Sequence, residues 1–302
     1  MILPALPIAD YVADRLPGVT GPTLNSSIAH LLLTRSAAHA RHAHPRLNPA
    51  WAPEEDSRFD LGTAAHAVLL EGKRNLIHIV EAPDWRSSAA KIARTLARAD
   101  GKVPLLTHQA TAVLALATCA EQAIHFSPDL ANLGPLVAEQ TLVWREPGGA
   151  FCRCRPDWMI TDHAVIISFK TAANAEPEAF GRQIISLGYD VQAAFEVRAV
   201  EMLTGKVPAY VWLVAEVDPP YACSLIGLSP TMAELGRQKY DRAVKLWAAC
   251  LASDTWPGYP ERIAYVEPPA WAMAQWAERW GYEAPGVDDG RPLADQLLGE
   301  RP

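Results

Sequence analysis

FCRCRPDWMITDHAVIISFKTAANAEPEAFGRQIISLGYDVQAAFE, residues 151–196, is the stretch that decides the fold. It reads as a β-hairpin followed by a loop and two helices. The second strand, residues 164–170, is a nearly continuous apolar run, which is typical of a strand buried on both faces. Lys170 ends this strand and needs an anion, because burying an unpaired ammonium costs several kcal/mol. Asp157 is the obvious neighbour, and such a pair can hold a divalent cation and a phosphate.

Arginines alternate with other residues along the first strand of this hairpin. Arg153, Arg155 and Asp157 are two residues apart, so we expect them to share one face of the strand. Because the guanidinium group matches phosphate geometry, Arg153 and Arg155 are candidates for clamping the phosphates on either side of a reacting one.

Several motifs in this chain resemble the PD-(D/E)xK nuclease superfamily. Residues 155–157 (RPD) and 168–170 (SFK) are similar to its two central motifs. Residues 59–72 (FDLGTAAHAVLLEG) resemble the helix that carries a metal-binding histidine in the RecB-like branch, and residues 189–195 (YDVQAAF) resemble that branch's glutamine helix. The RecE-type exonuclease VIII group is similar at residues 170–172 (KTA) and 177–180 (PEAF). The motifs keep the family order.

The resemblance implies a fold and an activity. The expected fold is α/β, with a restriction-endonuclease-like core in which helices flank a central mixed β-sheet. A helical part would precede this core, and a helical, aromatic tail would follow it. The implied activity is that of a Mg²⁺- or Mn²⁺-dependent exodeoxyribonuclease that digests double-stranded DNA ends from 5′ to 3′ in phage or prophage recombination. The family also implies a ring-shaped homo-oligomer that works beside a single-strand annealing protein.

The same resemblance assigns roles to residues. His66 and Asp157 would hold the metal, with Ser168 and the Phe169 carbonyl as further ligands. Lys170 would orient or deprotonate the attacking water and offset charge in the transition state.

Further candidates lie on either side of these motifs. Glu139 is an acid in an apolar strand opening, and it either lies near the metal or is an exposed residue at the strand start. Thr171 is placed to hydrogen-bond a phosphate or to cap the loop. Gln192 is placed to hydrogen-bond a nucleotide or orient a ligand, and Tyr189 to stack on a base or sugar. Arg182 is also a candidate DNA contact, although a solvent-facing helix surface explains Arg182 and Tyr189 equally well.

Ser168 departs from the family pattern, because relatives have Asp or Glu there. Serine is a weak, neutral ligand, and Mg²⁺ prefers carboxylate oxygen. Either another acid compensates, with Glu139 and Asp162 as candidates, or the site is impaired. The second interpretation is a pseudo-nuclease that binds DNA ends or recombination partners without cutting. A third is an inherited fold that binds no nucleic acid. The tyrosine that many relatives have after the glutamine is also missing, and Phe195 and Glu196 occupy that region.

Composition excludes several classes of protein. The formal net charge of −7 argues against a protein that coats nucleic acid through bulk charge. The five cysteines form no CxxC pair, so their spacing does not support an iron–sulfur cluster. Their odd number, with no signal peptide, predicts a cytoplasmic protein. No apolar run reaches the ~20 residues that span a membrane.

The chain divides into three predicted parts. Residues 1–22 lack periodicity and predict a flexible arm. Residues 23–251 contain all the motifs and predict the nuclease-like domain. Residues 252–302 are rich in tryptophan and predict a tail that packs on the core or on a neighbouring subunit.

Overall fold

The computed structural model describes residues 1–53, 60–71, 74–130, 134–160 and 162–281. Residues 59 and 72 of the histidine-helix motif, and residues 282–302 of the predicted tail, lie outside these ranges. The chain forms two compact units, Met1–Gly258 and Tyr259–Pro302. The first unit therefore ends at residue 258 rather than at the predicted 251.

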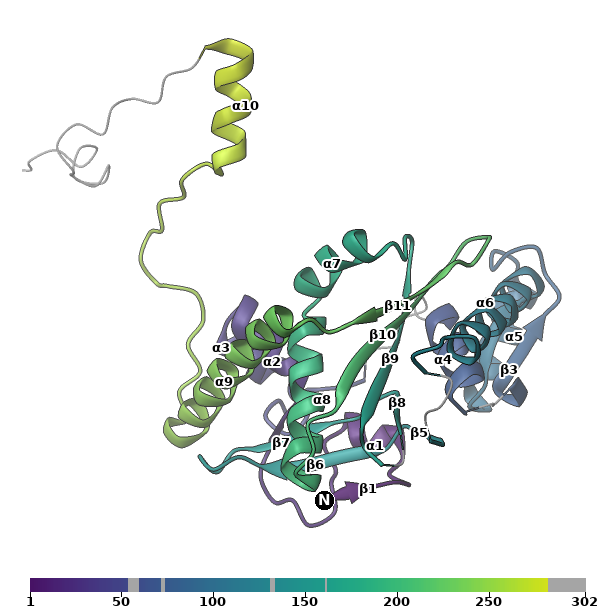
Figure 1. Ribbon diagram of the computed structural model, residues 1–302, viewed down its shortest axis with the longest axis horizontal. Helices are drawn as coiled ribbons and strands as arrows, with labels where there is room; N and C mark the ends of the chain where they lie inside the picture. Colours follow the sequence, from purple (N-terminus) through teal and green to yellow (C-terminus); the bar gives the residue numbers. More distant parts are fainter. Residues whose placement is uncertain (54–59, 72–73, 131–133, 161, 282–302) are drawn as a thin grey trace, which may run out of the picture. The chain divides into compact units, whose positions relative to one another are not determined.

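A five-stranded sheet forms the centre of the first unit, in the order β11-β10-β9-β8-β5 (Figure 1). Its strands are β5 (Leu136–Ala138), β8 (Trp158–Ile160), β9 (Val165–Ala172), β10 (Ala209–Glu216) and β11 (Cys223–Gly227). β9 and β10 are parallel, whereas the other neighbours are antiparallel. The predicted central mixed sheet is confirmed.

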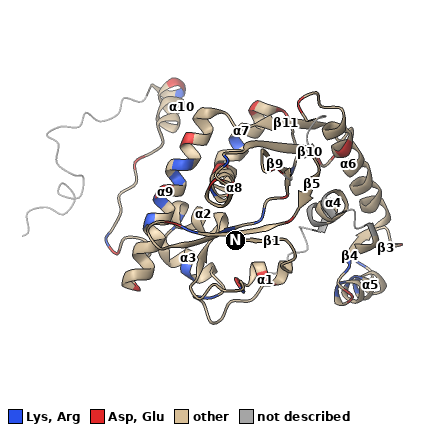
Figure 2. Cartoon of the chain, turned by 60° about the horizontal axis from the view of Figure 1, so that its bottom comes forward, with Lys and Arg blue, Asp and Glu red and all other residues tan. Residues whose placement is uncertain are grey.

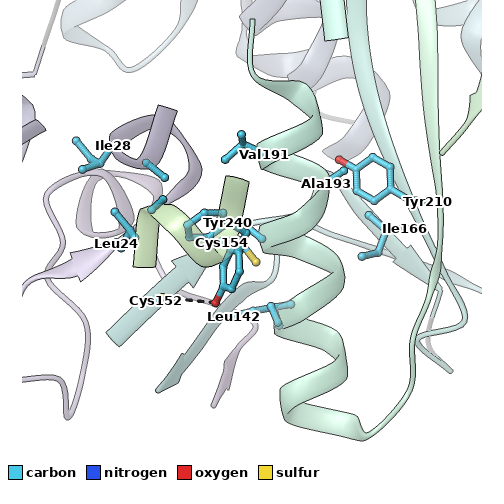
Figure 3. Packing of buried hydrophobic residues seen from close by; sticks show 14 of the residues in the cluster. Leu24, Ile28, Leu142, Cys152, Cys154, Ile166, Val191, Ala193, Tyr210 and Tyr240 are labelled. Atoms are coloured by element: carbon cyan, nitrogen blue, oxygen red, sulfur yellow. Dashed lines mark hydrogen bonds between the residues drawn. The ribbon is translucent and has the colours of Figure 1, made fainter. Parts of the chain in front are cut away.

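Helices cover both faces of this sheet (Figure 1). They are α4 (Asp60–Glu71), α6 (Thr107–His125) and α8 (Tyr189–Thr204). Side chains alternate along β9, so Ile166 packs in the cluster that includes α8, while Ile167 and Phe169 pack in the cluster that includes α4 and α6. Figure 3 shows Ile166 and Tyr210 lying against α8 from the sheet. Burial on both faces explains why the sequence of β9 is apolar throughout.

A second sheet has four strands in the order β1-β6-β7-β2. They are β1 (Ile2–Leu3), β2 (Thr23–Leu24), β6 (Thr141–Arg145) and β7 (Phe151–Cys154). The prediction of a flexible arm over residues 1–22 is wrong. β1 pairs with β6, and Leu16 and Val19 are buried in a cluster with Val143. Apolar burial and strand pairing hold this segment even though its sequence has no period.

Two strands that the sequence predicts as continuous are broken. The predicted strand through Arg153 and Asp157 splits into β7 and β8, which belong to different sheets, with Arg155 and Pro156 between them. Proline lacks the N–H that a sheet ladder needs. β5 and β6 are likewise separated at Glu139, whose φ of 57° is in the left-handed region. These breaks fix the positions of Asp157 and Glu139, because each residue lies where the chain passes from one sheet to the other.

The remaining elements of the first unit surround the sheets. They are α1 (Ile8–Val12), α2 (Ser26–Thr34), α3 (Ala37–Ala43), η2 (Arg74–Leu76), β3 (Ile77–Val80), α5 (Ser88–Ala99), β4 (Val103–Leu106), α7 (Pro177–Ser186) and α9 (Pro230–Ser253). β3 and β4 form a separate parallel pair. Lys and Arg are spread over several elements, and α9 carries both signs of charge (Figure 2). This distribution fits the negative net charge.

The second unit contains one described helix, α10 (Ala270–Trp280). Trp276 and Trp280 contact each other with ring centroids 5.9 Å apart, and both are more than half exposed. The predicted tail therefore contains a helix that carries aromatic side chains. Across the described residues of both units, no helix is long and apolar enough to span a membrane.

Candidate metal centre

Three side chains from distant parts of the chain meet beside the central sheet. His66 comes from α4, Glu139 from the break between β5 and β6, and Asp157 from the residue before β8. Their ligand atoms all lie within 4.8 Å of one another. His66 Nε2 is 3.0 Å from Asp157 Oδ1, and His66 Nδ1 is 3.3 Å from Glu139 Oε1. Imidazole nitrogen and carboxylate oxygen are donors that divalent cations accept.

The electrostatics of His66 show that this place favours positive charge. Burial lowers the pKa of His66, but the hydrogen bond to Asp157 and the negative charges of Asp157 and Glu139 outweigh it, so the pKa lies above its ordinary value. The two carboxylates therefore stabilise positive charge at the position of His66. The donor set therefore fits a divalent metal ion.

Asp157 is held from several directions. It is 7 % exposed, and its Oδ2 accepts hydrogen bonds from the Phe169 N–H at 2.7 Å and the Ser168 hydroxyl at 3.0 Å. Burial raises the pKa of Asp157, but the Lys170 charge and the His66 interactions outweigh it and bring the pKa below its ordinary range. The carboxylate is thus ionised and fixed in orientation at neutral pH.

Lys170 lies where the apolar strand ends, as the sequence predicts, and its Nζ is 3.9 Å from Asp157 Oδ2. The ammonium also lies 4.9 Å from the centre of the Tyr189 ring, which stacks on Phe180 with centroids 6.0 Å apart. A cation over an aromatic face is attracted by the ring quadrupole. Asp157 and Tyr189 together hold Lys170 at the edge of the metal centre.

Glu139 lies in the candidate donor cluster with His66 and Asp157. Its carboxylate also forms an ion pair with Arg155. The Arg155 Nη1 donates to the Leu6 carbonyl at 2.9 Å and to Thr141 Oγ1 at 3.0 Å. These contacts engage Nε and Nη1 of Arg155 inside the protein, where they hold Glu139; the phosphate contact of Arg155 stays a prediction.

Arg153 also lies away from the predicted phosphate position. It is 1 % exposed, and its Nη1 is 2.9 Å from both Asp14 Oδ1 and the Thr23 carbonyl. The prediction of a DNA contact is wrong for Arg153. A buried guanidinium paired with a buried carboxylate cannot reach a phosphate in solvent, and this pair joins the N-terminal segment to β7.

Ser168 is completely buried, and its hydroxyl hydrogen points at Asp157. The predicted role of Ser168 as a metal ligand is therefore corrected, because its hydroxyl serves as a donor to the Asp157 carboxylate, itself a candidate ligand. Asp162, one of the two acids expected to compensate, instead accepts a hydrogen bond from the Ala164 N–H at 2.9 Å in the turn before β9. Of the two compensating candidates, Glu139 is the one in the donor cluster.

The predicted nucleic-acid contacts fall in different places. Thr171 faces the opposite side of β9 from Lys170, because strand residues alternate. Arg182 is exposed on α7. Tyr189 lies against Lys170, and the Gln192 side-chain N–H donates to Glu196 Oε1 at 2.8 Å. Tyr189 is thus the residue of this group in direct contact with the metal centre's lysine.

Two buried polar residues near the site were missed from the sequence. Glu196 on α8 is 2 % exposed, and Tyr210 on β10 is 3 % exposed. Glu196 had a recognisable signal, since it lies four residues after Gln192 and so shares its helix face. Tyr210 carried no signal, because an aromatic residue in an apolar strand is ordinary core.

The mixed sheet flanked by helices, with the histidine, two acids and a lysine at one edge, defines a restriction-endonuclease-like protein of the PD-(D/E)xK class. A family model matches residues 30–269. The chain belongs to that family, the PDDEXK-like domain of unknown function (DUF3799).

A solved structure shares this fold. The crystal structure of a "Putative exonuclease" from Eubacterium rectale is 12% identical, with a TM-score of 0.53, and the match covers 85% of this chain and 93% of that chain. The crystal structure of SSO0001 is 11% identical over 79% of this chain and 86% of that chain, with a TM-score of 0.31. No curated protein matches the sequence.

Proposed function

We propose that the protein is a Mg²⁺- or Mn²⁺-dependent deoxyribonuclease that hydrolyses phosphodiester bonds. The observation that carries this proposal is the convergence of His66, Glu139 and Asp157, whose donor atoms lie within 4.8 Å, beside Lys170. Three oxygen and nitrogen donors next to an ammonium match the needs of metal-assisted phosphoryl transfer. A family of PDDEXK-like domains supports the same class.

The chemistry follows from these positions. A bound divalent cation supplies Lewis-acid polarisation of the phosphate and lowers the pKa of a water molecule. His66, Glu139 and Asp157 would hold it, and the Phe169 carbonyl remains a proposed further ligand. Lys170 is placed to orient the attacking water and to offset negative charge as the phosphate becomes five-coordinate. Tyr189 keeps the Lys170 ammonium from turning into solvent.

The finer assignment is a 5′-to-3′ exonuclease acting on double-stranded DNA ends in phage or prophage recombination. It is supported by the sequence resemblance to the RecE-type group at residues 170–172 and in the helix that follows. The same resemblance supports a homo-oligomer and a single-strand annealing protein as partners. Thr171, Arg182, Tyr189 and Gln192 remain proposed contacts to the DNA.

A second candidate function is a pseudo-nuclease that binds DNA ends or recombination partners without cutting. The observation that favours it is Ser168, a neutral residue where relatives have an acid. Ser168→Asp separates the two functions. If cleavage appears or rises by orders of magnitude, the natural site is impaired. If cleavage falls, serine is adapted to this site, because it donates a hydrogen bond to Asp157 that an aspartate cannot give.

The proposal is tested with linear duplex DNA and Mg²⁺ or Mn²⁺. The wild type should cleave, and Lys170→Ala should lose about 10²- to 10⁴-fold in rate, the usual contribution of a group that assists proton transfer. Asp157→Ala should lose both cleavage and Mn²⁺ binding, measured by isothermal titration. Lys245→Ala, which removes an exposed lysine on α9, is the matched control. A Lys170→Ala variant that cleaves at close to the wild-type rate would refute the proposed site.

A further inference from the structure

The two carboxylate oxygens of Glu139 have separate partners. Oε1 lies 3.3 Å from His66 Nδ1, inside the candidate donor cluster. Oε2 accepts a hydrogen bond from Arg155 Nε, which lies outside that cluster. Because a carboxylate is planar, a partner on each oxygen fixes the direction in which the group faces. The position of Arg155 therefore sets the orientation of Glu139.

Arg155 is in turn held by parts of the chain outside the donor cluster. Its Nη1 donates to the Leu6 carbonyl at 2.9 Å and to Thr141 Oγ1 at 3.0 Å, and its Cζ lies 6.0 Å from the centre of the Tyr11 ring. Leu6 and Tyr11 belong to the N-terminal segment, which β1 attaches to the second sheet. The Arg155 side chain is 13 % exposed, so it has little freedom to turn into solvent. A guanidinium group can hold such partners together because its donors form a rigid fork.

The backbone of Glu139 leaves the direction of its carboxylate open. The Glu139 N–H donates to the Asp157 carbonyl at 3.1 Å, which brings the two acidic residues together. A φ of 57° at Glu139 is rare for a residue other than glycine and persists where the surrounding structure holds it. The side chain still has several rotatable bonds, and ordering them costs conformational entropy. A contact on the carboxylate itself is therefore needed to keep it facing the donor cluster.

We propose that Arg155 is a positioning residue that holds the Glu139 carboxylate in its cation-binding orientation, with the N-terminal segment as its support. This inference rests on the proposed function of the same site. Groups that hydrogen-bond a metal ligand commonly change metal affinity by about 10- to 100-fold when removed. Residues 1–22 thereby contribute to the candidate metal centre, although the donor cluster of the described residues lies outside them.

The charge of Arg155 acts in the opposite direction from its hydrogen bonds, because a guanidinium beside the donor cluster repels a cation. A variant that lost this charge would mix the two effects. Arg155→Lys keeps the charge but replaces the fork with a single ammonium, which cannot hold Glu139 and the Leu6 carbonyl in the same geometry. Thr141→Val removes one acceptor of Arg155 and no charge. Both changes therefore report on orientation.

Isothermal titration of Mn²⁺ into the full-length variants measures the effect without DNA, and urea denaturation checks that each variant is folded. Arg155→Lys should bind Mn²⁺ about 10-fold more weakly than the wild type. Thr141→Val should also bind more weakly, by a smaller factor. Arg198→Lys is the matched control, because Arg198 forms an ion pair of 3.1 Å with Glu146 outside the donor cluster. It should bind Mn²⁺ as the wild type does.

A variant without Glu139 shows whether Arg155 acts through it. Glu139→Ala should weaken Mn²⁺ binding, because it deletes a donor. Arg155→Lys should cause no further loss in the Glu139→Ala background, since residues of one network give non-additive effects, whereas independent packing defects add. An equal further loss in that background would overturn the positioning role.

The outcomes separate this inference from the function on which it rests. If the wild type binds Mn²⁺ and Arg155→Lys binds it equally well, the positioning inference alone is overturned, and weaker binding of duplex DNA by this variant would assign Arg155 to a phosphate. Thr141→Val gives the same decision on positioning if Arg155→Lys does not fold. If the wild type neither binds Mn²⁺ nor cleaves DNA, the proposed function fails and the inference fails with it.

Discussion

The buried arginine of the second sheet shows how a single charge can hold a whole segment. Arg153 pairs with Asp14, which also accepts hydrogen bonds from the Thr23 N–H at 3.0 Å and the Thr23 hydroxyl at 2.6 Å. A buried pair of this kind is strongly destabilising to break, because removing one partner leaves the other charge buried and uncompensated. Residues 1–22 are thereby fixed to the core.

Arg153→Met should therefore reduce the free energy of unfolding by about 3–5 kcal/mol, measured by urea denaturation. DNA binding by the folded variant should keep the salt dependence of the wild type, because no phosphate contact is lost. Arg145→Met, which removes a more exposed arginine of the same sheet, is the control. A stable Arg153→Met variant with a shallower salt dependence would restore the phosphate-clamp interpretation.

Glu196 gives the protein a specific pH dependence of stability. Burial raises the pKa of Glu196 from 4.5 to about 7 in the folded protein, so the folded state keeps this proton longer than the unfolded chain does. The contribution is complete below about pH 4.5 and is lost as the pH rises through about 7. The change is on the order of 3 kcal/mol, since one pKa unit corresponds to about 1.4 kcal/mol.

Glu196→Gln should remove this dependence. The free energy of unfolding of the variant, relative to the wild type, should rise between pH 5 and pH 8, as measured by urea denaturation at each pH. Taking the difference cancels the titrations of His66 and Asp157, which both proteins share. Parallel stability curves across this range would show that Glu196 is already ionised, with a normal pKa, in the folded protein.

At the scale of elements, the crossing of α8 and α9 depends on a glycine. An added Cβ at Gly236 would lie 2.5 Å from the backbone carbonyl oxygen of Asp190, too close for any real contact. Since the obstacle is backbone and not a flexible side chain, the two helices would have to move apart. The absence of a side chain at 236 is thus what permits their close packing.

Gly236→Ala should lower the free energy of unfolding by about 1–3 kcal/mol, the usual cost of overpacking. Gly181→Ala is the matched control, because Gly181 is also inside a helix but has nothing within 4 Å of an added Cβ. That change should raise stability by about 0.5–1 kcal/mol through the lower entropy of the unfolded chain. Equal effects of the two substitutions, in urea denaturation, would contradict this account of the crossing.

At the scale of the whole molecule, the candidate metal centre belongs entirely to the first unit. All its residues lie within Met1–Gly258, and that unit contains its own buried clusters. The second unit carries exposed tryptophans on α10, of which Trp271 is 69 % exposed. Aromatic residues of this kind are common in contacts between subunits.

A chain ending at Gly258 should therefore bind Mn²⁺ with the affinity of the full-length protein. If the tail packs on a neighbouring subunit, one of its two predicted placements, sedimentation velocity should show a smaller assembly for the shortened chain than for the full-length one. Trp271→Ala in the full-length protein should shift the distribution in the same direction. A shortened chain with an unchanged assembly would place the subunit contacts in the first unit.

The sequence by itself determined the central features of the fold. The apolar run at residues 164–170 predicted the buried strand, the lysine at its end predicted the acid beside it, and family motifs pointed to His66. The structure confirms the buried strand and the acid beside its lysine, because side-chain period and the cost of burying a charge are readable along the chain.

Only the tertiary structure decided which distant groups meet. Arg153 and Asp14 are 139 residues apart, and nothing local distinguishes a buried arginine from one that faces DNA. Glu139 enters the metal cluster because the chain turns there into the left-handed region. Glu196 meets Tyr210 because α8 packs on the face of the sheet that carries Tyr210. The physical reason is the same in each case, since partners for buried charges are set by how sheets and helices pack.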